Sequence, residues 1–192
     1  MVTTTNPPIA VVPPFVLPDR NGKSYTTARL RGRRYGILLF LAPEDSETAA
    51  YLQSFATRQE EWAWLHTEIV VVMPASAATE TLPALPFPLL RDDGTVRTRV
   101  LPGLAPEAMA LIVTDLSGQV TNWRTARRVA SLPDIETALG WAWEVAQPKG
   151  SCGGVTWSAA AHPELPPSPP APIGRFTVGA RPHHGYRRRN TA

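Results

Sequence analysis

Residues 37–55 read ILLFLAPEDSETAAYLQSF and contain the start of a strand–helix unit. The apolar run that ends at Leu41 is typical of a strand covered on both faces of a sheet. It breaks at Pro43 into an acidic turn. Apolar residues then recur at three- and four-residue spacing over 46–65, which predicts an amphipathic helix with an interruption near Glu60. Such a unit, followed by another strand, needs a right-handed crossover and predicts parallel central strands.

The elements on either side of this unit predict an α/β domain. Two short strands flank turn residues 19–22 and form a hairpin near the N-terminus. Residues 109–124 give a second hairpin signal, and Ser131 is the predicted N-cap of a final helix. The other expected elements are a strand over 68–73, a proline-punctuated crossover over 74–90, and a short helix or strand over 95–101. We therefore expect a mixed central β-sheet flanked by helices.

Composition and charge predict one compact body between unstructured ends. The chain has 192 residues, of which 43% are hydrophobic and 21 are proline, and this size suits one domain. Residues 158–192 carry five of the 19 basic side chains but one of the 16 acidic ones, so residues 1–157 carry 14 basic and 15 acidic groups. We expect an extended segment over 1–12, one domain over 13–148, and a disordered Pro/Arg-rich tail over 149–192. The nearly neutral body argues against specific nucleic-acid binding.

The sequence also argues against membrane insertion, secretion and several kinds of cysteine chemistry. No apolar run approaches the roughly 18 residues of a membrane span. The N-terminus lacks the features of a signal peptide, so a cytoplasmic location is the default expectation. The single cysteine, Cys152, excludes an intramolecular disulfide and a cysteine-rich metal site. We expect neither a bound metal nor a cofactor.

Four segments, taken in order, resemble one protein family. They are PPFVLPDRNGK (13–23), EIVVVM (68–73), LPFPLLRDDGTV (85–96) and ALIVTDLSGQVTNW (110–123). The same order of motifs is found in the redoxin branch of the thioredoxin-like fold, the alkyl hydroperoxide reductase/thiol-specific antioxidant proteins that include the peroxiredoxins. The resemblance covers about residues 13–147. It implies a thioredoxin-like domain related to thiol peroxidases.

The active-site cysteines of that family are missing from the matching positions. The family places its reactive thiolate at the helix start after the apolar strand, where helix N–H groups lower the thiol pKa. Counted from Pro43, the peroxidatic cysteine falls on Ala50 and its hydroxyl residue on Glu47, while a Cys-x-x-Cys pair falls on Asp45 and Thr48. The arginine that the family places just before its V-x-D strand has no counterpart either. The resemblance implies a degenerate active-site turn made of Pro43, Glu44, Asp45, Ser46, Glu47, Thr48 and Ala50.

Two interpretations of this acidic turn remain open. Carboxylates and hydroxyls at a helix start cap exposed N–H groups and complement the helix dipole, and each contributes about 0.5–1 kcal/mol. The alternative is an acidic pocket that binds a cation or a basic partner. Carboxylates without a nearby histidine make a weak site for a hard metal ion.

Cys152 is the remaining candidate for thiol chemistry. It lies in KGSCGGVTW (149–157), which resembles a Cys-Pro-x-Cys-Gly segment of some redoxins with the first cysteine replaced by Lys149. A nearby lysine lowers a thiol pKa, but turnover without a resolving cysteine needs an external thiol or a second subunit. The leading hypothesis is a redoxin-fold protein that has lost catalysis and works by binding or scaffolding. The alternative is a weak thiol-dependent peroxidase or oxidoreductase that uses Cys152.

Tryptophan and arginine side chains are candidates for partner binding. Trp62 and Trp64, and likewise Trp141 and Trp143, form W-x-W pairs on predicted helices, so one member of each pair points away from the core. The outward members either lie half-buried at the periphery or form an aromatic docking face for a protein partner or a second copy of the chain. The arginines of 187–189 are a third candidate, as a tether to an acidic partner.

Overall fold

A computed structural model describes residues 9–42, 46–77, 82 and 84–147 of the chain. Three features predicted from the sequence lie outside the described residues: the C-terminal tail, Cys152, and residues 43–45 of the active-site turn. Within the described part, no helix combines the length and the apolar character needed to cross a membrane.

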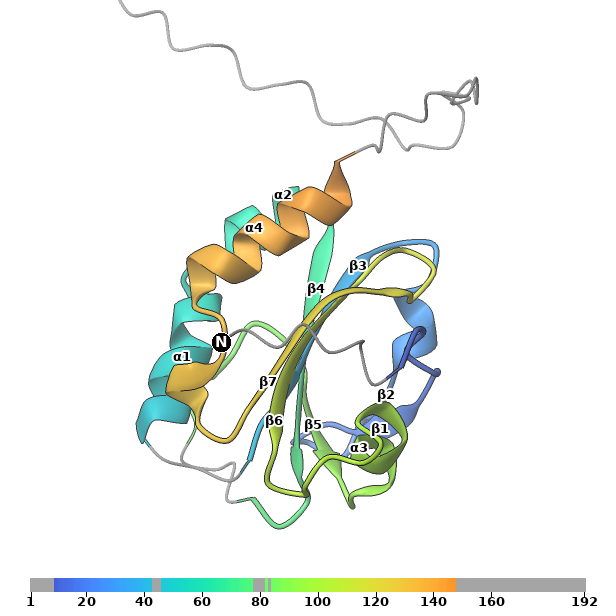
Figure 1. The fold of residues 1–192 in the computed structure, drawn as a ribbon, viewed down its shortest axis with the longest axis vertical. Coiled ribbons are helices and arrows are strands. Elements are labelled where there is room, and N and C mark those ends of the chain that lie inside the picture. The colour runs from blue at the N-terminus through green and yellow to red at the C-terminus, as the bar shows by residue number, and fades with distance from the viewer. Residues whose placement is uncertain (1–8, 43–45, 78–81, 83, 148–192) are drawn as a thin grey trace, which may run out of the picture. The chain divides into compact units, whose positions relative to one another are not determined.

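A five-stranded mixed sheet forms the centre of the domain (Figure 1). Its strands lie side by side in the order β5-β4-β3-β6-β7. β3 runs parallel to β4 and β4 parallel to β5, while β6 is antiparallel to both β3 and β7. The mixed sheet predicted from the sequence is therefore confirmed. The strand bounds are β3 Tyr35–Phe40, β4 Thr67–Pro74, β5 Leu89–Asp92, β6 Met109–Thr114 and β7 Val120–Ala126.

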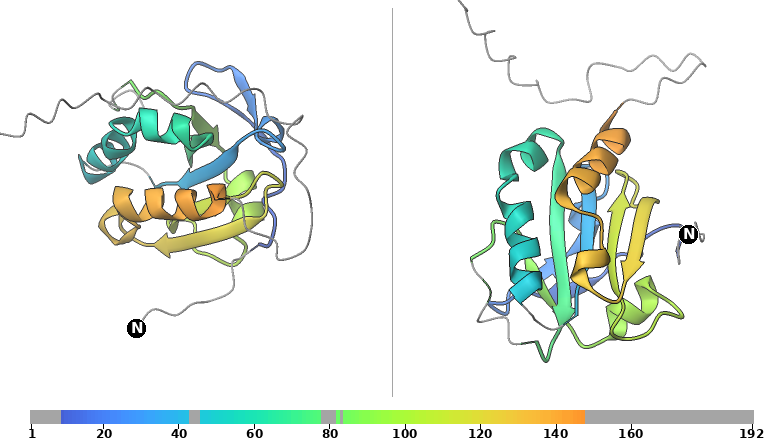
Figure 2. Two further views of the ribbon diagram at one scale, coloured as in Figure 1. Left: turned by 90° about the horizontal axis from the view of Figure 1, so that it is seen from above. Right: turned by 60° about the vertical axis from the view of Figure 1, so that its left-hand side comes forward.

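Each face of the sheet has its own hydrophobic core. In β3, Ile37 and Leu39 face one core while Leu38 and Phe40 face the other, so the strand is apolar without alternation. Figures 1 and 2 show α1, α2 and α4 over one face, with the β1–β2 hairpin and α3 on the opposite side. The helices are α1 Ser46–Ala56, α2 Gln59–Trp64, α3 Thr95–Val100 and α4 Ile135–Ala146, and the hairpin strands are β1 Val16–Pro18 and β2 Ser24–Thr26.

The last helix begins one turn later than the sequence predicts. Ser131, the predicted N-cap, instead ends a short 3-10 helix over Val129–Ser131. The N-cap is Asp134, whose carboxylate accepts the N–H of Thr137 at 2.9 Å. Val129 is buried in the core and anchors the 3-10 turn, so the chain makes one tight turn before the helix starts. Serine and aspartate are both good N-caps, and their propensities do not separate them.

Three other local predictions are refined by the structure. The crossover predicted over 74–90 ends in a fifth strand, β5, which pairs with β4 in parallel. The segment predicted as a short helix or strand is the helix α3. The long helix is interrupted at residues 57–58, slightly before Glu60, so α1 and α2 are separate helices.

Candidate functional site

The turn after β3 is the place where the resemblance expects a reactive thiol. The chain leaves the sheet after Phe40 and enters α1 at Ser46. At the start of α1, Glu47 and Ala50 are exposed, whereas Thr48 is buried. Residue 50 therefore lies on the surface of the helix. Residues 42 and 46–50, the described part of this turn and of the helix start, include no cysteine.

The structure places a buried cation beside this turn. Arg97 lies on α3 and is only 8% exposed. Its guanidinium donates a hydrogen bond to the carbonyl of Leu41 at 2.6 Å and a second one to the carbonyl of Ala108. Leu41 immediately precedes the turn, and Ala108 immediately precedes β6. Arg97 thus joins the end of β3 to the start of β6.

The sequence pattern does not single out Arg97 because the resemblance places the family's arginine in a different segment. The family's arginine is expected just before β6, and between Leu101 and Ile112 the sequence contains none. Here a guanidinium reaches the residue before β6 from α3 instead. The available signal was the position of Arg97 in α3, since Val96, Arg97 and Val100 share the buried side of this short helix.

Asp92 provides the local electrostatics that hold Arg97. Its carboxylate accepts the N–H groups of Val96 at 3.0 Å and of Arg97 at 2.8 Å, which fixes the start of α3. Burial lowers the pKa of the Arg97 guanidinium from its ordinary value, and attraction to Asp92 opposes that change. An arginine remains charged under these conditions. The guanidinium carbon also lies 5.9 Å from the centre of the Phe40 ring, within the range of a cation–π contact.

The contacts of Arg97 support the backbone around the turn after β3. The described hydrogen bonds of the guanidinium end on two backbone carbonyls, so they stabilise the strand ends on either side of the site. A thiol peroxidase needs a sulfur nucleophile at the helix start, and the matching positions of this chain have none. The only sulfhydryl of the sequence, Cys152, lies outside the described residues.

Each W-x-W pair has one exposed member, as predicted, and the other member, Trp62 or Trp141, packs in or against the core. Trp62 is buried, stacks on Phe55 with ring centres 5.7 Å apart, and donates its indole N–H to the Phe55 carbonyl. Trp64 and Trp143 are 67% and 45% exposed. Their rings stack on each other, 5.1 Å apart and 12° from parallel. Residues far apart in the sequence therefore build one exposed aromatic surface at the ends of α2 and α4.

The surroundings of this aromatic pair are acidic. Glu60 is exposed one helical turn before Trp64, on the same side of α2. Glu144 follows Trp143 in α4, is exposed at the edge of the aromatic pair, and accepts a hydrogen bond from the side-chain amide of Asn122 in β7 at 3.4 Å. Within the described residues, no ion pair joins either carboxylate to a cation, whereas Arg58 pairs with both Glu61 and Glu136. We call the surface formed by Trp64, Trp143, Glu60 and Glu144 the tryptophan face.

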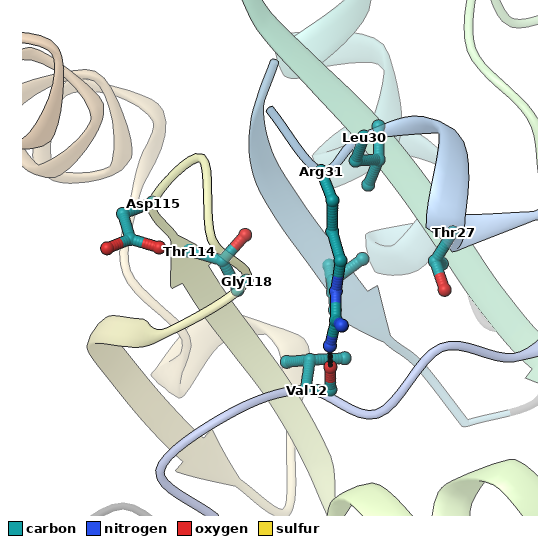
Figure 3. A pocket seen from close by; sticks show the side chains of 8 residues that line it. Val12, Thr27, Leu30, Arg31, Thr114, Asp115 and Gly118 are labelled. Carbon is teal, nitrogen blue, oxygen red and sulfur yellow. Dashed lines mark hydrogen bonds between the residues drawn. The ribbon is translucent and has the colours of Figure 1, made fainter. Parts of the chain in front are cut away.

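The described residues contain no group of three or more His, Cys, Asp or Glu side chains placed to hold a metal ion. A cavity of about 20 Å³ lies near Val12 and Asp115, and Arg31 donates to the Val12 carbonyl there at 2.9 Å. Figure 3 shows the side chains that line this cavity. This volume suits about one water molecule.

Comparison with known proteins supports the fold. No protein-family model and no curated protein matches the sequence. Among solved structures, peroxidoxin BcpB of Mycobacterium tuberculosis is 20% identical, with a TM-score of 0.57 over 70% of this chain and 95% of that chain. Peroxiredoxin Q of Xanthomonas campestris is 17% identical, with a TM-score of 0.58 over 75% and 99%. A 2-Cys peroxiredoxin of Plasmodium vivax is 14% identical, with a TM-score of 0.56 over 67% and 76%. The chain has the thioredoxin-like fold, as the resemblance implies.

Proposed function

We propose that this thioredoxin-like chain is a non-catalytic relative of thiol peroxidases that works by binding a protein partner. The fold positions a helix start where related chemistry needs a thiolate. In this sequence the corresponding residues are Asp45, Glu47, Thr48 and Ala50, and the single cysteine, Cys152, comes about a hundred residues later. Without these cysteines, the domain would act through its surface, by binding another protein.

The observation that carries the binding role is the tryptophan face. Large aromatic side chains are usually buried. Two tryptophan rings that stack on each other while exposed to solvent indicate a surface suited to binding another molecule. Tryptophan is enriched among the residues that contribute most to protein–protein binding. The stack also fixes both rings before any partner arrives, which lowers the entropic cost of association.

Charge favours a basic partner over a second copy of the chain. Glu60 on the tryptophan face and Glu144 at its edge, where Asn122 donates to the carboxylate, give this surface a negative potential, and two such faces would repel each other. An arginine or lysine side chain can lie over an indole ring and also pair with a nearby carboxylate. The proposed occupant is therefore a basic segment of another protein, and a homodimer through this face is an outcome that the binding test would reveal.

Binding of an octa-arginine peptide tests this role. We expect saturable binding to the wild-type protein, measured by fluorescence anisotropy at constant ionic strength. The double variant Trp64→Ala/Trp143→Ala should bind about tenfold more weakly because it loses cation–π contacts while keeping every charge. The matched control is Val16→Ala, which trims an exposed apolar side chain elsewhere on the domain and should leave binding unchanged.

Two results would contradict the proposed binding role. One is equal affinity of the wild type and the double tryptophan variant, which would reduce the attraction to general electrostatics. The other is a concentration-dependent dimer that is lost in the same variant, which would make the face a self-association surface. Turnover that depends on Cys152 would instead favour the alternative, a weak thiol-dependent peroxidase or oxidoreductase.

A further inference from the structure

A second surface feature lies at the opposite end of β3 from the turn that follows this strand. It is a cleft of about 300 Å³ beside the first residues of β4, and we call it the β4 cleft. Arg34, which borders it, immediately precedes β3, whereas the turn follows the last residues of that strand. A strand of this length spans roughly 20 Å. The cleft is therefore separate from the site where the resemblance places chemistry.

The cleft exists because β5 covers only half of β4. Pairing between the two strands begins at Val71 and Leu89, so residues 67–70 of β4 have no strand partner on that side. Pro88 accepts the N–H of Val71 at 3.0 Å but has no N–H of its own with which to continue the ladder. Pro86 adds a second interruption just before it. Sequence thus prevents β5 from extending and leaves this edge of the sheet open.

The inner side of the β4 cleft is apolar. Phe55, Trp62 and Ile69 form its floor, and all three belong to the hydrophobic core under α1 and α2. Half-buried Phe87 and exposed Ala63 line its walls. Its volume is at the lower end of the range for small-molecule sites, and it suits a ligand of about one or two aromatic rings.

The rim of the cleft carries an organised positive charge. The Glu68 side chain is 14% exposed. Its carboxylate oxygens lie 3.3 Å from Nη2 of Arg29 and 3.7 Å from Nε of Arg34. The Tyr25 hydroxyl donates to the same carboxylate at 2.8 Å. Burial and the hydrogen bond to Glu68 raise the pKa of Tyr25, so the phenol stays protonated and adds no negative charge. Two cations around one anion leave a net charge of about +1 at the rim.

Both arginines remain available to a ligand. Their side chains are 56% and 50% exposed, so the contact with Glu68 orients them without removing them from solvent. A guanidinium has five N–H donors, and a single shared carboxylate cannot satisfy two guanidinium groups. An anion at the rim would accept the remaining donors while its apolar body contacts Phe87 and Ala63.

We propose that the β4 cleft binds an aryl carboxylate, with the carboxylate at Arg29 and Arg34 and the ring system against the apolar floor and walls. The site goes beyond the proposed protein-binding role, and either can fail without the other. A neutral aromatic molecule would lose the charge-assisted hydrogen bonds at the rim. An aryl cation would meet a net positive charge.

Isothermal titration calorimetry with 2-naphthoate tests the site. We expect one saturable site on the full-length wild-type chain and weaker binding of 2-naphthamide, which has the same rings without the charge. The variant Arg29→Gln/Arg34→Gln should bind 2-naphthoate at least about tenfold more weakly. Arg33→Gln is the matched control because it removes an exposed arginine next to the cleft that does not line it, and it should leave affinity unchanged.

Two further variants locate the bound rings. Ala63→Phe fills the cleft from an exposed helix position without changing any charge, and it should abolish binding. Trp64→Ala/Trp143→Ala should bind 2-naphthoate like the wild type, because the tryptophan face is a different surface. Thermal denaturation checks that each variant is folded. Absence of saturable binding to the wild type would overturn the proposal. So would equal binding of 2-naphthamide, retained binding in Arg29→Gln/Arg34→Gln or Ala63→Phe, or loss of binding in the tryptophan variant.

Discussion

Arg97 shows how one buried residue can hold together the backbone on either side of a turn. Its guanidinium donates to the Leu41 carbonyl, before the turn that follows β3, and to the Ala108 carbonyl, before β6. Asp92 accepts a backbone N–H at the start of α3, the helix that contains Arg97. A buried charge is costly unless it is hydrogen-bonded. We therefore expect the backbone on either side of the turn to depend on the hydrogen bonds of Arg97.

Replacing Arg97 tests this role at the scale of a single residue. Arg97→Met keeps an unbranched apolar stem but leaves two buried carbonyls without their donor and Asp92 without its neighbouring cation. We expect a loss of about 3 kcal/mol in the free energy of unfolding, measured by urea denaturation. Arg99→Met, an exposed substitution on the same helix, should change the free energy by less than about 0.5 kcal/mol. Equal effects of the two substitutions would rule out the supporting role of Arg97.

At the scale of elements, pattern and propensity predict the order of strands and helices but not their mutual geometry. The apolar runs of β3, β4 and β6 are strong signals because both faces of each strand are buried. β5 is only four residues long, contains Arg91 and Asp92, and follows a proline, so its pattern is that of a loop. β5 forms a strand because it pairs with β4. A local sequence pattern does not show which segment lies beside that strand.

The tryptophan face illustrates the same limit between elements. Helical spacing predicts that one tryptophan of each W-x-W pair points outward but does not fix which one, and the exposed members are Trp64 and Trp143. That they touch depends on how α2 and α4 cross the same face of the sheet, about eighty residues apart in sequence. Arg97 is a similar case, since its contacts at Leu41 and Ala108 belong to other elements.

The start of α4 gives a prediction with a defined pH dependence. Hydrogen bonds from the side chain and backbone of Thr137 lower the pKa of Asp134, so the folded protein favours the carboxylate. That stabilisation is present above the ordinary pKa of aspartate, about 3.9, and is lost as the pH falls through the lower folded value. Asp134→Ala should lower the Tm at pH 7, and the difference from the wild type should shrink on acidification.

The variant Asp134→Asn separates the cap from the charge. Asparagine also caps helices well but does not titrate. We expect this variant to keep most of the wild-type Tm at pH 7 and to lose less stability than the wild type as the pH falls below about 4, as thermal denaturation at several pH values would show. A gap between the wild type and Asp134→Ala that stays constant down to pH 2 would contradict a charged cap.

At the scale of the whole molecule, the proposed binding surfaces lie at the opposite end of the central strands from the turn after β3. The turn after β3 lies at one end of the central strands, while the C-terminal ends of α2 and α4 and the first residues of β4 lie toward the other (Figure 1). The described features that suit binding, the tryptophan face and the β4 cleft, are both found away from the turn. A thioredoxin-like fold can host many functions, and here the surface supplies the specific features.

Peroxide consumption in the presence of a dithiol reductant tests the central claim most directly. The wild-type protein and Cys152→Ser are compared at equal concentration with hydrogen peroxide and an alkyl hydroperoxide, against the reductant alone. We expect that neither protein accelerates consumption above the reductant, because the helix start after β3 lacks sulfur. Catalytic turnover by the wild type that disappears in Cys152→Ser would contradict it and identify the chain as a thiol-dependent enzyme.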